Sequence, residues 1–307
     1  MRKKNMPVLL ESKLFTHLWG GSLLKENLNK KYSDENVGES WEVSAHPKGN
    51  STIASGEYAG MAFGEYYKKV LGNKAEYPLL IKLIGPKKDL SVQVHPDDAY
   101  AKVHENSLGK KEAWYVLSAP EGGKLIAGVN CTKEEFKEAV ENGKAEKTLN
   151  YLNCKKGDFI SIDSGLVHAL LADVIVYEVQ QNSDITYRIY DWDRVDEKTK
   201  QPRELHVEKA FEVIDFEKSA KMERSSGADY QMLTDNEYFS LSKINFEGEY
   251  KDSSKSSGAY TIIKGQADVC IDNEILFSVS KGDSFYAPYC NNFTILGKGE
   301  MLKSTEK

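Results

Sequence analysis

The hydrophobic pattern of this chain is mostly that of short strands. The clearest period-two stretch places Val92 and Val94 between polar residues, which predicts a strand with one apolar and one polar face. The side chains of Gln93 and His95 should therefore point the same way, and Pro96 ends the run. A strand that presents an amide and an imidazole side by side offers two metal ligands.

Other runs bounded by Gly, Pro and Asp also predict strands. They lie at 38–46, 78–84, 112–117, 159–162, 167–171, 174–180 and 186–190, with more strands after residue 229. Helical spacing is limited to 62–71, 97–105, 132–143 and 203–216, and a short turn is expected at 149–152. The helix at 132–143 begins with the Thr-x-x-Glu pattern of a capping box. Many short strands with few helices favour an antiparallel sandwich or jelly roll over an alternating βαβ fold.

An internal repeat suggests that one β unit is used twice. Lys-Gly-Asp at 156–158 is followed, ten residues after its Asp, by His168, and Lys-Gly-Asp at 281–283 is followed at the same distance by Phe293. A cupin-type jelly roll delivers a histidine to its interior by such a turn, strand and second turn. We therefore expect a mainly β protein of two cupin-type barrels with a few short inserted helices. The first barrel would hold a site, and the second would have a filled interior.

The polar, Gly- and Ser-bearing segment 218–229 is the best linker candidate. It divides the chain into a predicted metal-binding catalytic domain, 1–228, and a smaller cupin-like domain, 229–307, that lacks metal ligands.

Composition narrows the function classes. The 307 residues are 40% hydrophobic and 29% charged, with a net charge of −6 that mixes acidic and basic residues. This lacks the electrostatic signature of a nucleic-acid binder, and no apolar run reaches the ~18 residues of a membrane span. Residues 1–7 do not resemble a secretory signal, so we expect a cytoplasmic protein. The four cysteines, Cys131, Cys154, Cys270 and Cys290, form no Cys-x-x-Cys pair and are expected to be buried or incidental thiols.

Four residues form the candidate metal site: Gln93, His95, Glu112 and His168. Two imidazoles, a carboxylate and an amide suit a divalent cation with room for substrate or water. The nearby cations Lys82, Lys110 and Arg188 could bind a phosphate. The other histidines, His17, His46, His104 and His206, are assigned to structure or surface.

These residues resemble the type I mannose-6-phosphate isomerases, also called phosphomannose isomerases, in their shorter bacterial form. The resemblance covers most of the chain and rests on motifs in the family's order at 19–21, 45–47, 90–96, 110–112, 165–169 and 181–188. It implies one zinc ion per chain, with Gln93, His95, Glu112 and His168 as ligands. It also implies a catalytic arginine at Arg188, with Asp184 and Glu178 as carboxylates lining the pocket, and Ser91, Lys82 and Lys110 around the substrate. The expected substrate is a small sugar phosphate, and the protein could be a monomer or a homodimer.

Longer members of that family carry a His before the lysine that matches Lys110 and a Pro after it. Here these positions are Gly109 and Lys111. Longer members also hold a sizeable helical domain between the metal strands, where this chain has space only for short helices.

The general base is left open by the sequence. Glu178 follows an apolar run, and burial would raise its pKa toward neutrality. Asp184 and a zinc-bound hydroxide are the alternatives. Two other functions are also compatible with the pattern: a non-catalytic metal-binding sugar sensor, and an iron-dependent cupin oxygenase that uses two His and one carboxylate.

Overall fold

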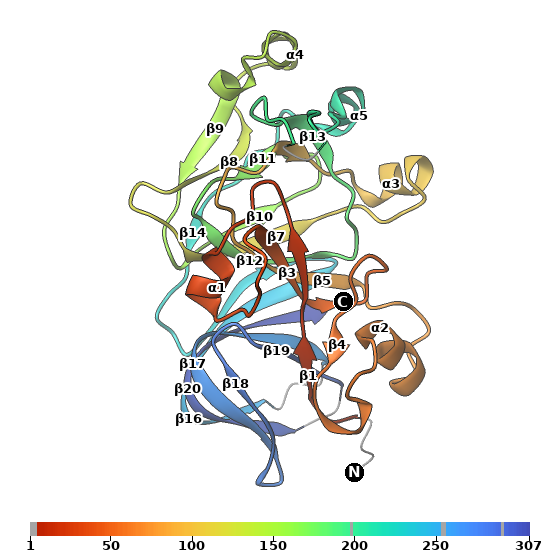
Figure 1. Cartoon of the computed structure of the whole chain (residues 1–307), viewed down its shortest axis with the longest axis vertical. Coiled ribbons are helices and arrows are strands. Elements are labelled where there is room, and N and C mark those ends of the chain that lie inside the picture. Colours follow the sequence, from red (N-terminus) through yellow and green to blue (C-terminus); the bar gives the residue numbers. More distant parts are fainter. Residues whose placement is uncertain (1–4, 197–198, 253–255, 290–291) are drawn as a thin grey trace.

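The computed structural model describes residues 5–196, 199–252, 256–289 and 292–307. Its strands form three antiparallel sheets, which are connected by loops and short helices (Figure 1). No helix in the described part of the chain has both the length and the apolar composition needed to cross a membrane. Cys131, Cys154 and Cys270 are free thiols, as expected, whereas Cys290 and residues 1–4 lie outside the described residues.

The first barrel is built from two sheets. The seven-stranded sheet has the order β14-β10-β7-β12-β5-β3-β2. Its strands are β14 (Glu223–Arg224), β10 (Asp158–Ile162), β7 (Glu112–Ser118), β12 (Ile175–Gln181), β5 (Leu79–Ile84), β3 (Val37–Ser44) and β2 (Lys13–Thr16). The five-stranded sheet has the order β13-β6-β11-β8-β9. Its strands are β13 (Tyr187–Tyr190), β6 (Val92–Val94), β11 (His168–Leu170), β8 (Lys124–Val129) and β9 (Leu149–Asn153).

The second barrel is an eight-stranded sheet with the order β15-β16-β20-β17-β19-β1-β4, in which β18 pairs with β17. Its strands are β15 (Tyr230–Asp235), β16 (Phe239–Asp252), β20 (Phe293–Glu306), β17 (Gly258–Ile271), β18 (Glu274–Ser280), β19 (Ser284–Ala287), β1 (Val8–Glu11) and β4 (Thr52–Ile53). Because β1 pairs with β19, the amino terminus contributes to the sheet of the carboxy-terminal strands. The domain division at residue 228 stays a prediction, and sheet pairing crosses it.

The helices of the described residues are short. They are α1 (Leu23–Leu28), α2 (Phe63–Glu65), α3 (Asp98–His104), α4 (Lys133–Glu141) and α5 (Val207–Val213), with short 3₁₀ or π turns η2 (Gly56–Tyr58), η3 (Tyr66–Val70) and η4 (Ala145–Thr148). Figure 1 shows α4 and α5 at the end of the first barrel farthest from β16–β20. The predicted capping box is confirmed, because Thr132 Oγ1 accepts from Glu135 N and Glu135 Oε2 accepts from Thr132 N.

Three sequence predictions were wrong in detail. The expected turn at 149–152 is strand β9, because it pairs with β8, a partner that a short sequence window cannot reveal. The helix expected at 203–216 covers only Val207–Val213, since the backbone before it bonds to β13 through His206 N and Arg188 O. The linker candidate 218–229 contains β14, which pairs with β10.

The internal repeat is confirmed in three dimensions. The backbone φ angle is +89° at Gly157 and +95° at Gly282. The Asp after each glycine accepts a hydrogen bond from the backbone N–H three residues earlier. His168 then begins β11, and Phe293 begins β20. Phe293 is buried, with its ring 5.4 Å from that of Tyr260, so an aromatic cluster fills the second barrel.

The repeat glycines provide a stability test. A Cβ on Gly282 would lie 1.9 Å from the carbonyl oxygen of Leu28, whereas the nearest atom to a Cβ on Gly157 would be Ser225 Oγ at 3.2 Å. We expect Gly157→Ala to lower the free energy of unfolding by about 1–2 kcal/mol, the cost of a left-handed non-glycine residue. Gly282→Ala should cost about 2–4 kcal/mol, because the backbone clash adds to that strain. Urea unfolding of the two variants measures the difference, and equal losses would contradict the role of the clash.

Candidate active site and metal centre

Cross-strand register aligns three of the predicted site residues on the five-stranded sheet. His168 on β11 and Arg188 on β13 both lie opposite Gln93 on β6. Directly opposed residues of an antiparallel pair project from the same face. The side chains of Gln93, His168 and Arg188 therefore form one row that faces the barrel interior.

The seven-stranded sheet supplies the opposing wall. Glu178 on β12 lies opposite Lys82 on β5 and Trp114 on β7, and Glu112 on β7 lies opposite Gln180 on β12. These pairings bring carboxylates and a lysine to the interior from neighbouring strands. The site is thus formed where the two sheets of the first barrel face each other.

Three of the predicted ligands meet at one point. The ligand atoms of His95, Glu112 and His168 all lie within 4.8 Å of one another. His95 Nε2 is 3.6 Å from Glu112 Oε2, and His168 Nε2 is 3.4 Å from Glu112 Oε1. All three residues are almost fully buried, at 1%, 1% and 0% exposure. The prediction that these three residues lie together is confirmed.

The protonation of this group suits metal binding. His168 Nδ1 lies 2.9 Å from the carbonyl oxygen of Leu166, so the ring N–H donates there and the Nε2 lone pair faces Glu112. Burial lowers the pKa of His168 to about 4 and holds the pKa of His95 well below its usual range, with Lys110 adding to the effect on His95. Both imidazoles are therefore neutral at pH 7.

The pKa of Glu112 shifts in the opposite direction to those of the two histidines. Burial raises the pKa of its carboxyl to about 7, and the neighbouring Glu178 adds to the increase, whereas Lys110 opposes it. A divalent cation beside the carboxyl favours its ionised form. Lys110 Nζ already places a positive charge here, 2.9 Å from Glu112 Oε2 and 3.0 Å from His95 Nε2. Two neutral imidazoles and a carboxylate in a buried, cation-attracting position fit a divalent metal.

Gln93 lies beside this group. Its Nε2 is 3.3 Å from His168 Nε2. The two ends of a side-chain amide are assigned from their contacts, and exchanging them would turn Oε1 toward the same position. Ligation by Gln93 stays a prediction.

A cavity of about 330 Å³ opens beside the metal-binding group. It is lined by His17, Trp19, Glu39, Trp41, Lys82, Ile84, Leu90, Ser91, Gln93, Lys110, Trp114, Glu178, Asp184, Thr186, Arg188 and Arg203. The structure therefore brings all the residues predicted for catalysis and substrate binding to one cavity. Gln93 and Lys110 line it and also touch the metal-binding histidines, which connects the cavity to the metal position.

The sequence predicted a raised pKa for Glu178, and this prediction was wrong. Burial does act to raise it, but Lys82, Lys110 and a hydrogen bond from Trp114 outweigh burial and lower the pKa below its usual value. Lys82 Nζ lies 3.1 Å from Glu178 Oε1, and Trp114 Nε1 donates to Glu178 Oε2 at 2.7 Å. Glu178 is a buried carboxylate held in place at both oxygens.

Asp184 is also ionised. Hydrogen bonding to His46 and an ion pair with Lys48 lower its pKa, although burial opposes them. Its side chain is 30% exposed. Both candidate bases therefore occupy the cavity as carboxylates, with Asp184 nearer to solvent.

The side-chain hydrogen bonds of Arg188 go to neutral groups. Arg188 Nε donates to Ser91 Oγ at 3.2 Å, and its Nη1 donates to the carbonyl oxygen of Glu204 at 2.7 Å. Asp191 binds Arg194 and Arg203. The guanidinium of Arg188 therefore lines the cavity beside neutral acceptors.

The lining also includes polar and aromatic residues that the sequence did not assign to the site, among them His17, Glu39, Trp41 and Arg203. Trp41 Nε1 donates to Glu39 Oε2 at 2.7 Å, and Glu39 Oε2 is also 3.8 Å from Lys82 Nζ. Burial acts to raise the pKa of Glu39, but Lys82 and His17 lower it to about 2. The alternation at 38–46 was the available signal, since Glu39 and Trp41 share one face of that predicted strand.

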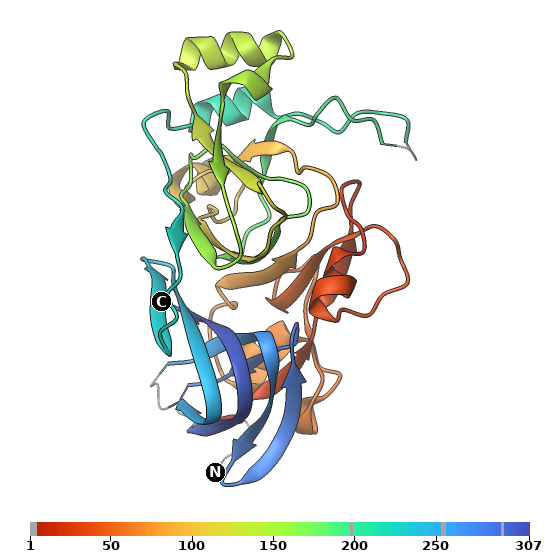
Figure 2. The same ribbon diagram turned by 90° about the vertical axis from the view of Figure 1, so that its left-hand side faces the viewer.

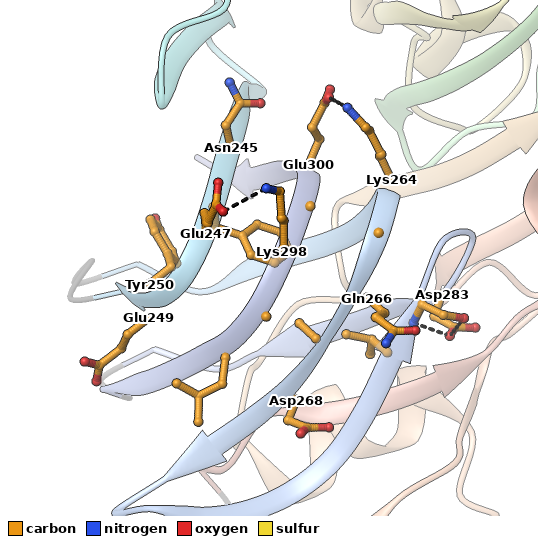
Figure 3. Close-up of a pocket in the computed structure, with 18 of the residues that line it drawn as sticks. Asn245, Glu247, Glu249, Tyr250, Lys264, Gln266, Asp268, Asp283, Lys298 and Glu300 are labelled. Carbon is orange, nitrogen blue, oxygen red and sulfur yellow. Dashed lines mark hydrogen bonds and ion pairs between the residues drawn. The ribbon is translucent and has the colours of Figure 1, made fainter.

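A larger concavity of about 1540 Å³ lies on the second barrel, across β16, β17, β18 and β20 (Figure 3). Figure 3 shows two ion pairs in it, Lys264 with Glu300 at 2.9 Å and Lys298 with Glu247 at 2.7 Å. Among the described residues, the grouping of His, Cys, Asp and Glu able to hold a metal is the one in the first barrel. The group that could hold a metal therefore lies beside the smaller cavity.

Fold and site together define a class: a two-barrel, cupin-type protein with a buried His–Glu–His metal-binding group beside a cavity rich in cations. Residues 8–121 match the family model of the phosphomannose isomerase type I catalytic domain. The chain is 37% identical to the probable mannose-6-phosphate isomerase GmuF of Bacillus subtilis, covering 97% of this chain and 98% of that protein. It is 34% identical to the mannose-6-phosphate isomerase of Streptococcus mutans, with 92% of both chains covered. The crystal structure of the mannose 6-phosphate isomerase from B. subtilis superposes with a TM-score of 0.90 at 34% identity, covering 97% of this chain and 99% of that chain. The chain belongs to the type I phosphomannose isomerase family.

Proposed function

We propose that this protein is a zinc-dependent aldose–ketose isomerase that interconverts mannose 6-phosphate and fructose 6-phosphate. The observation that supports this most strongly is the buried group of His95, Glu112 and His168 beside a cavity lined by Arg188, Lys82 and Lys110. Relatives that match nearly the whole chain are named for the same reaction.

The reaction moves one proton from C2 to C1 through a cis-enediolate whose charge lies on O1 and O2. Arg188 would stabilise that charge through its guanidinium, in a cavity where the low dielectric strengthens the interaction. Lys110, which lines the same cavity, adds a second positive charge 2.9 Å from Glu112 Oε2. Zinc, held by His95, Glu112 and His168 with Gln93 as the proposed fourth ligand, would supply Lewis acidity that polarises the sugar carbonyl.

We assign proton transfer to Glu178. It is almost fully buried, it lines the cavity, and Lys82 and Trp114 fix both of its oxygens. Asp184, bound to Lys48 nearer to solvent, would position the sugar instead.

Two matched variants test this assignment. We expect Glu178→Gln to lower kcat by about 100-fold, within the range typical of a lost general base. Asp184→Asn should lower kcat by less than about tenfold, as expected for a hydrogen bond that the substrate makes equally in ground and transition states. Exchange of the C2 hydrogen with deuterated water, followed by NMR, reports the proton step directly. A Glu178→Gln protein with undiminished exchange would assign the base elsewhere.

The function itself is tested by a coupled assay. Purified protein is given mannose 6-phosphate, and formation of fructose 6-phosphate is followed before chelation, after chelation and after zinc is restored. Turnover that disappears with the metal and returns with zinc supports the proposal. A protein that binds the sugar phosphate without turnover would be a sensor, and oxygen consumption with iron would indicate an oxygenase.

A further inference from the structure

A third cavity, of about 610 Å³, lies on the second barrel. Strand β16 lines it with Ser240 and Ser242, and strand β20 lines it with Lys303 and Thr305. In the ladder between the two strands, the serines lie directly opposite Lys303 and Thr305, and directly opposed residues project from the same face. Lys303 also lies opposite Tyr260, a member of the aromatic cluster in the barrel interior. The face that these residues share therefore points into the second barrel.

A buried ion pair borders this cavity. Lys303 Nζ is 3.0 Å from Asp252 Oδ2 and 5.3 Å from the centre of the Tyr260 ring. The Tyr260 hydroxyl donates to the same carboxylate oxygen at 2.6 Å. Lys303 is 8% exposed and Asp252 is 4% exposed. Because burying two charges carries a desolvation cost that apolar side chains avoid, stability alone does not explain this pair.

The strand ladders relate Lys303 to Glu178 of the first barrel. Trp114 and Tyr260 each lie opposite the residue two positions after the Asp of a Lys-Gly-Asp turn, so they occupy equivalent positions. On the next strand of its sheet, Trp114 has Glu178 as its opposite residue. Tyr260 has Lys303 as its opposite residue on the corresponding strand. Lys303 therefore takes the position of the proposed general base.

Asp252 takes the position of Gln93 in the same way. Gln93 lies opposite His168, where the first copy of the repeat ends. Asp252 lies opposite Phe293, where the second copy ends. The second barrel thus carries charged side chains at positions that line the site in the first barrel, but it has phenylalanine in place of a histidine. A ligand in the second barrel would be bound by direct polar contacts.

The side chains around the cavity suit a sugar ring. Ser240, Ser242 and Thr305 provide hydroxyl groups, which can both donate and accept hydrogen bonds. Tyr230 and Tyr250 also line the cavity, and aromatic rings offer an apolar surface for the C–H face of a sugar. The volume falls within the range of small-molecule sites, which combine such rings with a few placed polar groups.

The charges around the cavity disfavour an anion. Three lysines line it, Lys251, Lys303 and Lys307, and each has a carboxylate oxygen within 3.0 Å. Glu306 adds a further carboxylate to the lining. No positive charge is therefore left in excess for a phosphate or a carboxylate.

We propose that the second barrel binds an uncharged hexose in this cavity, with Lys303, Asp252 and Ser240 contacting the sugar hydroxyls. Figure 2 shows the strands of the second barrel, in blue, at the end of the molecule opposite to α4. No described residue lines both this cavity and the one beside the metal-binding group. The hexose site is therefore separate from the isomerase site and does not depend on the proposed function.

An NMR titration of the isotope-labelled protein with D-mannose, the uncharged counterpart of the proposed substrate, tests the proposal. We expect a Kd of about 1 mM, typical of a small ligand held by a few hydrogen bonds, with shifts in the backbone resonances of Ser240 and Ser242. The four tryptophans lie at positions 19, 41, 114 and 192, all in the first barrel, so tryptophan fluorescence should stay unchanged. His168→Ala, which alters the first barrel, should bind D-mannose with the wild-type Kd.

Two variants remove proposed contacts. Lys303→Met should raise the Kd for D-mannose by about 10- to 100-fold, the factor for losing a hydrogen bond from a charged group. Ser240→Ala should raise it by about 3- to 10-fold, the factor for a neutral hydrogen bond. Lys243→Met is the matched control, because Lys243 is also buried and pairs with a carboxylate, Glu300 at 3.3 Å, but lines the larger concavity instead. It should leave the Kd unchanged.

Failure of wild type to bind D-mannose at concentrations well above the expected Kd would overturn the proposal. So would binding that Lys303→Met and Ser240→Ala leave unchanged, or binding that His168→Ala abolishes, since these results would place the sugar elsewhere. Inorganic phosphate that shifts the Ser240 and Ser242 resonances more strongly than D-mannose would contradict the uncharged ligand. If Lys303→Met does not fold, as judged by its thermal midpoint, the titration of Ser240→Ala decides the question.

Discussion

Replacement of His168 by alanine is expected to abolish metal binding and to lower kcat/KM by more than about 10⁴-fold, since the proposed Lewis acid is lost with it. His168 Nε2 faces Glu112 Oε1 at 3.4 Å, and its ring is fixed by the contact of Nδ1 with the carbonyl oxygen of Leu166. Removing the imidazole leaves His95 and Glu112 without the third close ligand. Metal analysis of the purified variant and the coupled assay measure the two losses.

His104→Ala is the control for this experiment. His104 is exposed on α3 and stacks on Tyr100, with ring centroids 4.0 Å apart, away from the cavity. We expect its metal content and activity to equal those of wild type. A His168→Ala protein that retained stoichiometric zinc, or that turned over at the wild-type rate, would remove the metal centre from the proposed function.

Arg188→Ala is expected to keep its metal and to lose about 10³-fold in kcat. The residue contacts Ser91 and the backbone of Glu204 and makes no contact with the three close ligands. Loss of the guanidinium removes a charge that stabilises the enediolate, and the loss of one such group typically costs 10²–10³-fold or somewhat more.

In Arg188→Ala, the metal content should stay the same while kcat falls. Metal analysis should give wild-type zinc content, and single-turnover measurements at saturating substrate should show the slow chemical step. Arg188→Lys, which retains a positive charge without the planar fork, should recover part of kcat. Wild-type kcat in Arg188→Ala would contradict the catalytic role, and loss of zinc would show that Arg188 supports the metal site instead.

Part of the site could be predicted from short sequence patterns. The alternation around Val92 and Val94 placed Gln93 and His95 on one face, and the repeated Lys-Gly-Asp turn placed His168 and Phe293 at equivalent positions. Local rules suffice here, because the period of a strand and the conformation of a glycine turn depend on neighbouring residues alone. The same rules mistook β9 for a turn, since its pairing partners on β8 lie 20 to 29 residues earlier in the chain.

The pKa of Glu178 could not be predicted from neighbouring residues in the sequence. An apolar run correctly indicated burial, but the pKa depends on Lys82, Lys110 and Trp114, which come from other strands. Arg203 gave no local signal at all. Its contact with Asp191 and the cavity that it lines are formed only when the first barrel folds.

The sequence by itself determined the mainly β architecture, the doubled barrel, and the residue types available to bind a cation and a sugar phosphate. Only the tertiary structure decided which of those residues meet and which carboxylates are ionised. The physical reason is how far apart along the chain the interacting residues lie. Strand period and turn conformation are set by bonds within a few residues, whereas coordination, desolvation and charge balance are set by distances between segments that the fold alone brings together.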